Sequence, residues 1–127
     1  MDTEPAELEL SVATDSGADA EEVERLVRSL RLELSELELD GVEPIAADAP
    51  PGTRAADAIV VGALLVKLVR SSESLAAVVR TVRGWLGPRG DRRVRIELDG
   101  DVLELTGTSD AERERLIATW IERHARA

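Results

Sequence analysis

The sequence predicts an α+β domain in which a small, mostly antiparallel sheet that includes a β-hairpin is covered by amphipathic helices. Three observations lead to this fold class: an alternating apolar segment near the N-terminus, an Asp-Gly hairpin signal near residue 100, and several segments with apolar residues at helical spacing. The chain has 127 residues, of which 43% are hydrophobic, so it can bury one core. We therefore expect a single domain over residues 1–127.

A strand and then a helix are expected first. Leu8, Leu10 and Val12 alternate with polar residues, which predicts a half-buried strand over residues 7–12. Asp19 and Glu22 then form a capping-box-like start for a helix over residues 20–32. The apolar residues of this helix fall at i, i+3, i+4 and i+7 and are Val23, Leu26, Val27 and Leu30.

The following segment leaves helix and strand open. Residues 32–45 fit a helix end followed by a strand, because Asp40 and Gly41 interrupt the helical pattern, but the few apolar residues do not decide between the two. Residues 46–53 contain the run Pro-Pro-Gly and no large apolar side chain, so they predict an extended loop.

Residues 55–69 form the most apolar stretch of the chain. We expect a buried helix here, with a buried strand around residues 59–61 as the alternative, because periodicity does not separate the two. The apolar run is shorter than the roughly 20 residues of a membrane-spanning helix, and Lys67 and Arg70 end it. A second amphipathic helix follows and ends at Gly87-Pro88, with an apolar face made of Leu75, Val78, Val79, Val82 and Leu86.

The clearest local prediction is a hairpin over residues 94–106. Asp99-Gly100 is a strong signal for a two-residue turn, and this turn fixes the register of the two strands. The expected cross-strand pairs are Leu98 with Asp101, Ile96 with Leu103, Val94 with Leu105 and Arg95 with Glu104. A last helix starts at a capping box of Ser109 and Glu112, and its expected buried residues are Leu116, Ile117, Trp120 and Ile121.

No catalytic or metal-binding constellation is recognisable in the sequence. The chain has no cysteine, and its one histidine, His124, lies in the last turn of a predicted helix, where a solvated cation is the favoured interpretation over a catalytic base. Asp99-Gly100-Asp101 lacks the further ligands of a calcium loop and is explained by the hairpin. Phosphate-binding glycine motifs are absent as well. We therefore expect no enzyme activity, no cofactor and no metal.

Charge is distributed unevenly along the chain, whose formal net charge is -10. Residues 1–60 carry 16 acidic and 4 basic side chains, whereas residues 61–127 carry 10 and 12. The cations of the second part either solvate the backs of helices or form an interface for an acidic partner or a second copy of the chain. The candidate partner-binding residues are Arg80, Arg83, Trp85, Arg89, Arg92 and Arg93. Trp85 has two interpretations, an exposed anchor or a core residue beside Val82 and Leu86.

Nucleic acid is not an expected partner, because the chain is strongly acidic and its only aromatic residues are Trp85 and Trp120. The acidic N-terminus has neither the basic start nor the apolar core of a signal peptide, so we expect a cytoplasmic protein.

The order of these segments resembles a known family, the effector-associated constant component 1 family of actinobacterial conflict systems. The segments that carry the resemblance are ELELSV, VERLVRSL, APPGTRAADAIVVGALL, SLAAVVRTVRGWL and RRVRIELDGDVLELTG. The stretch that ends in Arg83-Gly84-Trp85-Leu86 and leads into a basic turn and strand is the most characteristic part. The resemblance covers most of the chain but includes no catalytic signature, so no functional residue is carried over from it.

The resemblance implies the constant, non-enzymatic partner of a variable effector, which is often a caspase-like peptidase. By this analogy the chain is an adaptor, sensor or regulator of an effector in antiphage defence or programmed cell death. Two other hypotheses are weaker. The apolar segments at residues 55–86, if both are helical, would allow insertion into a membrane, and an unrecognised carboxylate site would allow catalysis.

Overall fold

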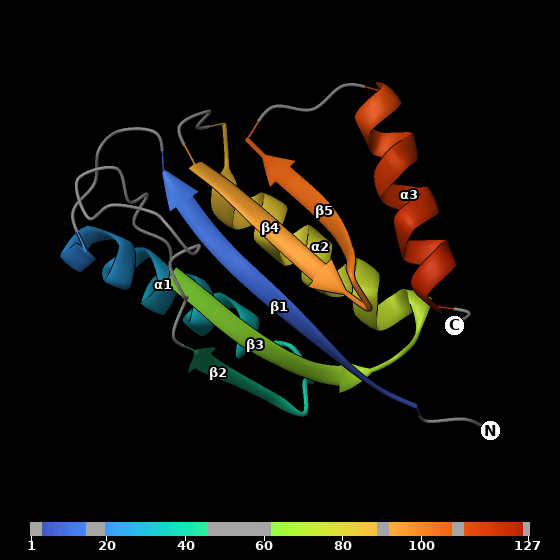
Figure 1. Cartoon of the computed structure of the whole chain (residues 1–127), viewed down its shortest axis with the longest axis horizontal. Helices are drawn as coiled ribbons and strands as arrows, with labels where there is room; N and C mark the ends of the chain where they lie inside the picture. Colours follow the sequence, from blue (N-terminus) through green and yellow to red (C-terminus); the bar gives the residue numbers. More distant parts are fainter. Residues whose placement is uncertain (1–3, 15–19, 46–61, 89–91, 108–110, 126–127) are drawn as a thin grey trace.

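The computed structural model describes residues 4–14, 20–45, 62–88, 92–107 and 111–125. These residues form five strands and three helices (Figure 1). In chain order, the elements are β1 (Pro5–Thr14), α1 (Ala20–Leu34), β2 (Gly41–Ile45), β3 (Gly62–Val69), α2 (Ser72–Leu86), β4 (Arg92–Leu98), β5 (Asp101–Thr106) and α3 (Ala111–Ala125).

The strands form one sheet in the order β2-β3-β1-β4-β5, and every neighbouring pair is antiparallel. The first six elements follow the order β1-α1-β2-β3-α2-β4, with β1 and β3 side by side in the middle of their four strands. Two split βαβ units interleaved in this way are the ferredoxin-like arrangement, to which this chain adds β5 and α3. The α+β class with an antiparallel sheet and a hairpin is confirmed.

The helices cover one face of the sheet and leave the other open. In Figure 1, α1 and α2 lie behind the sheet, and α3 stands beside β5 at the sheet's edge. Burial alternates along β1, as it must when successive side chains point to opposite faces. The covered-face residues of the inner strands are fully buried and include Leu8, Leu10, Val12, Leu64, Val66, Val94 and Ile96.

For residues 55–69 the sequence favoured a buried helix and left a strand open, and in the described part of this range the structure shows the strand β3, Gly62–Val69. On the open face of the sheet, β3 carries the apolar residues Ala63, Leu65 and Val69 beside Lys67, so both faces of this strand are mostly apolar and the alternation that marks a half-buried strand is hidden. Leu64 and Leu68 are buried, whereas Leu65 and Lys67 on the open face are half-buried. The predicted loop at residues 46–53 and the apolar residues 55–61 lie outside the described part of the chain.

The strand interpretation of the end of residues 32–45 is confirmed by β2, which begins at Gly41. No helix within the described ranges is both long and apolar enough to cross a membrane. The membrane hypothesis assumed two adjacent apolar helices, and in the described part of residues 55–86 only α2 is helical.

The predictions for α2 and the hairpin are confirmed. All five apolar residues expected on one face of α2 are buried. The hydroxyl of Ser71 accepts the amide of Ser74 at 3.0 Å as an N-cap, and Gly87 ends the helix with a φ of 60°. Asp99 and Gly100 have φ values of 53° and 82°, and the strand register around them agrees with the predicted pairs.

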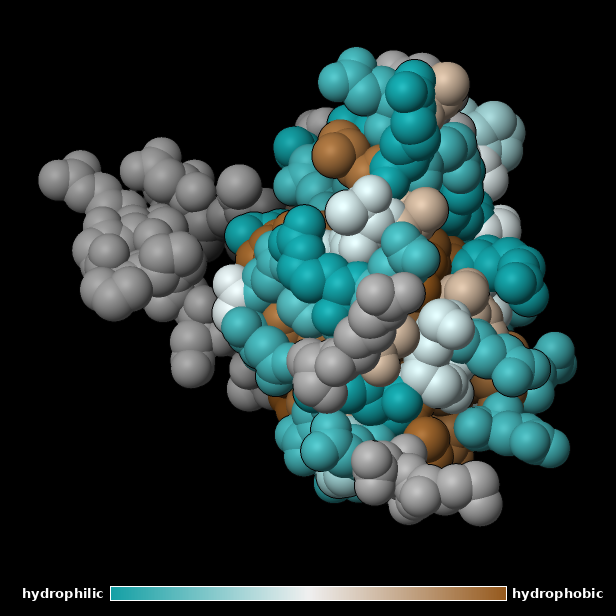
Figure 2. Space-filling view, turned by 90° about the vertical axis from the view of Figure 1, so that its right-hand side faces the viewer, coloured by the Kyte–Doolittle hydropathy of each residue, from teal (hydrophilic) through white to brown (hydrophobic). Residues whose placement is uncertain are grey.

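The last helix buries a different set of residues from the one expected. Ile117 and Trp120 are buried as predicted and Ile121 packs against the core, but Leu116 is 62% exposed, so its predicted burial is wrong. The third buried residue of α3 is His124. Seen from the side on which β5 and α3 lie, the surface is mostly hydrophilic, with small hydrophobic areas between the polar side chains (Figure 2). The predicted cap at Ser109 lies outside the described residues.

Candidate functional site

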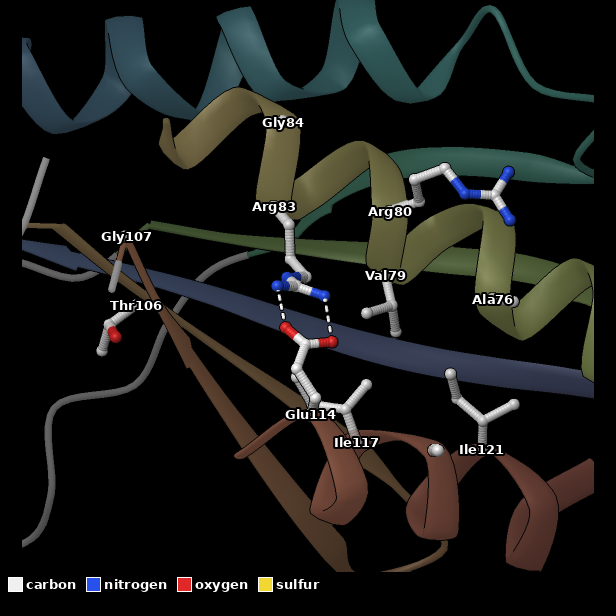
Figure 3. Close-up of a pocket in the computed structure, with 11 residues that line it drawn as sticks. Ala76, Val79, Arg80, Arg83, Gly84, Thr106, Gly107, Glu114, Ile117 and Ile121 are labelled. Carbon is white, nitrogen blue, oxygen red and sulfur yellow. Dashed lines mark hydrogen bonds and ion pairs between the residues drawn. The ribbon is translucent and has the colours of Figure 1, made fainter. Parts of the chain in front are cut away.

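A groove of about 570 Å³ runs between α2 and α3 (Figure 3). Its apolar lining includes Val79 from α2 and Ile117 and Ile121 from α3, and Thr106 and Gly107 lie at the end where β5 leaves the sheet. Two of the sequence-predicted partner-binding residues, Arg80 and Arg83, also line it. This groove is therefore the place where predicted functional residues and a concave surface coincide.

The helical period explains why α2 presents these residues to α3. Val79 and Arg83 are four residues apart on α2, so they lie on the same side of the helix, and both line the groove beside α3. On α3, Ile117 and Ile121 have the same spacing and point into the groove from the opposite wall (Figure 3). The groove is thus lined from both helices by apolar side chains, of which Val79 and Ile117 are buried and Ile121 is half-buried.

Arg83 and Glu114 bridge the two helices at one point of the groove. The Arg83 Nη1 atom donates to Glu114 Oε2 at 2.9 Å, and Nη2 donates to Oε1, so the guanidinium holds the carboxylate with two hydrogen bonds (Figure 3). Both side chains are partly exposed, which limits the contribution of the pair to roughly 0–1 kcal/mol. The Arg83–Glu114 pair therefore joins α2 to α3 at this point of the groove but contributes little to the stability of the fold.

Arg80 differs from Arg83 in its surroundings. It is exposed, its guanidinium points away from the Arg83–Glu114 pair in Figure 3, and it has no hydrogen bond or ion pair with any residue that the structure describes. A cation at the rim of an apolar groove attracts an acidic group on an incoming partner without first breaking a contact. Arg80 is therefore the predicted residue best placed to act on a partner.

The other predicted residues lie elsewhere. Trp85 is half-buried on the opposite side of α2, where its indole Nε1 donates to the Ser29 hydroxyl at 3.1 Å and the Arg92 guanidinium lies 5.5 Å from the ring centroid. Arg93 alternates with buried Val94 and belongs to the open face of the sheet. The predicted cationic surface is therefore divided among the groove, the Trp85 contact and the open face, and Arg89 lies outside the described residues.

His124 is buried, so the expectation of a solvated histidine is wrong. Its Nε2 atom lies 2.8 Å from Asp101 Oδ2, which also accepts Arg123 Nη1 at 2.7 Å. The His124 carbonyl accepts Arg70 Nη1 at 3.0 Å, and Arg70 also pairs with Asp99 at 3.1 Å. These contacts, which we call the hairpin latch, tie the end of α3 to the Asp99-Gly100 turn.

The hairpin latch changes the titration of one group. The hydrogen bond from His124 lowers the pKa of Asp101 below its usual value near 3.8, and the nearby charge of Arg123 lowers the pKa further, although burial opposes both effects. Among the described residues, the contacts of the hairpin latch involve only arginine, histidine and aspartate side chains and one backbone carbonyl. Across the ranges that the structure describes, no three metal-ligating side chains are grouped to hold an ion. The groove and the latch therefore suit binding and structural support.

Sequence reasoning did not find the α3 side of the groove. Glu114, Ile117 and Ile121 were placed on a helix, but nothing in the sequence signals which helix faces them, because that follows from the packing of α3 beside α2. No family model matches this chain, and no curated protein or solved structure matches it either. The family resemblance of the sequence stays a prediction.

Proposed function

We propose that this chain is a non-catalytic, cytoplasmic adaptor, sensor or regulator that binds an effector protein through the groove between α2 and α3. The observation that carries the proposal is the combination of an apolar groove with Arg80 at its rim, whose charge has no ion-pair partner among the residues that the structure describes. Pockets of this kind bind a partner through a few buried apolar contacts and use charge to orient it.

The chemistry of the groove specifies the kind of partner segment. Buried Val79 and Ile117 form an apolar floor and half-buried Ile121 adds to it, so an apolar side chain of the partner fits there, and exposed Arg80 favours an acidic residue beside it. Because the whole chain carries a net charge of -10, this local attraction acts against a general repulsion of acidic proteins. A partner must therefore place its acidic group close to Arg80, which makes binding selective.

The class of effector comes from the sequence resemblance and not from the groove. The resemblance implies a caspase-like peptidase in a bacterial antiphage or cell-death system, with this chain as its constant, non-enzymatic partner. The groove supports this proposal only by offering a surface suited to a protein segment. A second copy of the chain is the other candidate partner, since the acidic and basic parts of the sequence complement each other.

Co-expression of the tagged chain with the product of its neighbouring gene, which we expect to be the peptidase, tests the proposal. We expect the two proteins to co-purify, and we expect Arg80→Glu to reduce the captured peptidase by about tenfold, because it places an acidic group where the partner's acidic group binds. Arg28→Glu on the exposed face of α1 is the matched control, since it changes the charge equally at a distance from the groove. We expect this control to capture as much peptidase as the wild type.

If both variants capture equally little peptidase, the loss is a general effect of charge, and the claim that the partner binds in the groove is wrong. The absence of any co-purified peptidase with the wild-type chain would overturn the effector proposal itself.

A further inference from the structure

A second groove, distinct from the first, lies between the outer edge of β5 and α3. Its volume is about 320 Å³, and its β5 wall runs from Asp101 to Glu104. One face of α3 forms the other wall, with residues at helical spacing: Arg113, Leu116, Ile117, Trp120 and Arg123. Figure 2 views this side of the molecule.

β5 is an edge strand whose backbone hydrogen-bonding groups are partly turned outward. The residues that flank the two-residue turn, Leu98 and Asp101, form a hydrogen-bonded pair, so the N–H and C=O groups of alternate residues point to β4 and away from it in turn. By this alternation the backbone groups of Val102 and Glu104 point away from the sheet. The contact from Arg113 Nη1 to the Glu104 carbonyl at 3.5 Å agrees with that direction.

Apolar side chains are exposed where these backbone groups emerge. Val102 is 39% exposed and Leu116 is 62% exposed, although each lies beside buried apolar residues of the same groove, such as Leu103 and Ile117. An edge strand with outward-facing backbone groups beside a partly apolar helix face is a surface to which an extended peptide adds as a further strand, and here such a peptide would replace the long contact from Arg113 to the Glu104 carbonyl. Hydrogen bonds would then hold the peptide backbone, and the helix would contact every second side chain.

The groove also carries a cation at each end. Arg113 reaches Glu104 at one end, and Arg123 pairs with Asp101 at the other, so α3 runs antiparallel to β5. The two arginines are ten residues apart on the helix, which is roughly 15 Å at 1.5 Å per residue. An extended chain covers that distance in about four residues, and residues at even spacing point to the same side.

We propose that this groove binds an extended segment of a partner protein by strand addition to β5, and that the segment has the pattern acidic-x-apolar-x-acidic. The central apolar side chain packs against Leu116 and Trp120, and the two acidic side chains meet Arg113 and Arg123. The pattern follows from the positive charge of Arg113 and Arg123 and from the spacing of these two residues along α3. This site shares only Ile117 with the groove between α2 and α3, and its test uses Leu116, which does not line that groove, so the two proposals can fail separately.

Two labelled peptides with identical composition test this inference. The probe is acetyl-Glu-Thr-Leu-Thr-Glu-amide, and the control is acetyl-Thr-Glu-Leu-Glu-Thr-amide, in which the acidic side chains point to the face opposite the leucine. By fluorescence anisotropy we expect the probe to bind at least about tenfold more tightly than the control. In amide NMR spectra, we expect the probe to shift the resonances of Val102 and Glu104.

Two exposed leucines provide matched protein variants. Leu116→Glu places a charge in the groove, whereas Leu32→Glu makes the same change on α1, where Leu32 is 68% exposed. Because both positions are exposed, we expect both variants to keep the wild-type circular dichroism spectrum. We expect Leu116→Glu to weaken probe binding about tenfold and Leu32→Glu to leave it within about twofold.

Equal affinity for the two peptides, unchanged binding by Leu116→Glu, or no binding of the probe up to about 1 mM would overturn the proposal. Amide shifts at Val102 and Glu104 that depend on protein concentration without any peptide would also overturn it, because they would assign the β5 edge to a second copy of the chain.

Discussion

Asp101 is a single carboxylate that serves two basic side chains of α3. His124 and Arg123 both contact its Oδ2 atom, and the His124 hydrogen bond, followed by the charge of Arg123, lowers the pKa of Asp101. Folding therefore favours the ionised form. The resulting stabilisation is present above the unfolded-state pKa near 3.8 and is lost as the pH falls through the lower folded-state pKa.

Asp101→Asn tests this linkage. We expect the variant to be less stable than the wild type at neutral pH, and we expect the difference to shrink as the pH falls from about 5 to about 2. Urea unfolding at several pH values in this range measures both curves. A difference that stays constant down to the lowest pH would contradict the role given to the ionised carboxylate.

Two glycines should respond in opposite ways to replacement by alanine. A Cβ atom at Gly62 would collide with Val27 Cγ2 and lie 3.1 Å from Val23 Cγ1, because α1 packs closely against the start of β3. A Cβ atom at Gly84 in α2 would meet nothing within 4 Å. We expect Gly62→Ala to destabilise the fold by about 1–3 kcal/mol and Gly84→Ala to stabilise it by about 0.5–1 kcal/mol.

Thermal and urea unfolding of the two variants against the wild type checks both signs. A stable Gly62→Ala protein would mean that α1 and β3 are less closely packed than the structure shows.

At the scale of elements, α3 depends on Trp120 for its attachment. Trp120 is 4% exposed and stacks against the His124 ring at a centroid distance of 4.7 Å. Its indole N–H has no hydrogen-bond partner in the described part of the chain, and an unsatisfied buried donor costs about 1–3 kcal/mol. The buried ring of Trp120 therefore stabilises the fold, whereas its unsatisfied N–H group destabilises it.

We expect Trp120→Ala to lower the free energy of unfolding by about 3–5 kcal/mol and Trp120→Phe by less than about 2 kcal/mol, because phenylalanine keeps most of the ring and removes the unsatisfied donor. Urea unfolding measures both values. If both variants lower the free energy of unfolding by the same amount, the unsatisfied indole N–H does not destabilise this fold.

The elements that sequence reasoning predicted well are those whose signal is local. The Asp99-Gly100 turn fixes its own register, and the apolar face of α2 is complete within fifteen residues. A helix was favoured over a strand for β3 because its open face is also mostly apolar, which hides the alternation of a strand. Leu116 was expected in the core, but its burial depends on where α3 docks. Both cases have one cause: the correct prediction depends on the tertiary neighbours of the residues, which the local sequence does not show.

The same limit applies to the candidate site. Arg80 and Arg83 were selected as part of a cationic segment, and the structure places both in the groove between α2 and α3. Trp85 and Arg92 contact each other on another side of α2, so closeness in sequence did not mean one surface. Neither Glu114 nor the edge of β5 carried a signal in the sequence, because their significance arises only from the position of α3.

On the scale of the whole molecule, the fold combines a strongly acidic chain with cations gathered at two grooves beside α3. Complexes that form through such local charges weaken as salt screens them over roughly 10 Å at 0.1 M ionic strength. A complex formed through the apolar groove walls as well should lose affinity with salt but not dissociate completely.

The most direct test of the proposed function is light scattering of the purified chain mixed with the co-expressed peptidase, at low and at high salt. We expect one species with the mass of a complex at low salt and a partial release of the chain from the peptidase at high salt. A chain that stays monomeric beside the free peptidase in both salts would contradict the claim that it is an adaptor of that effector.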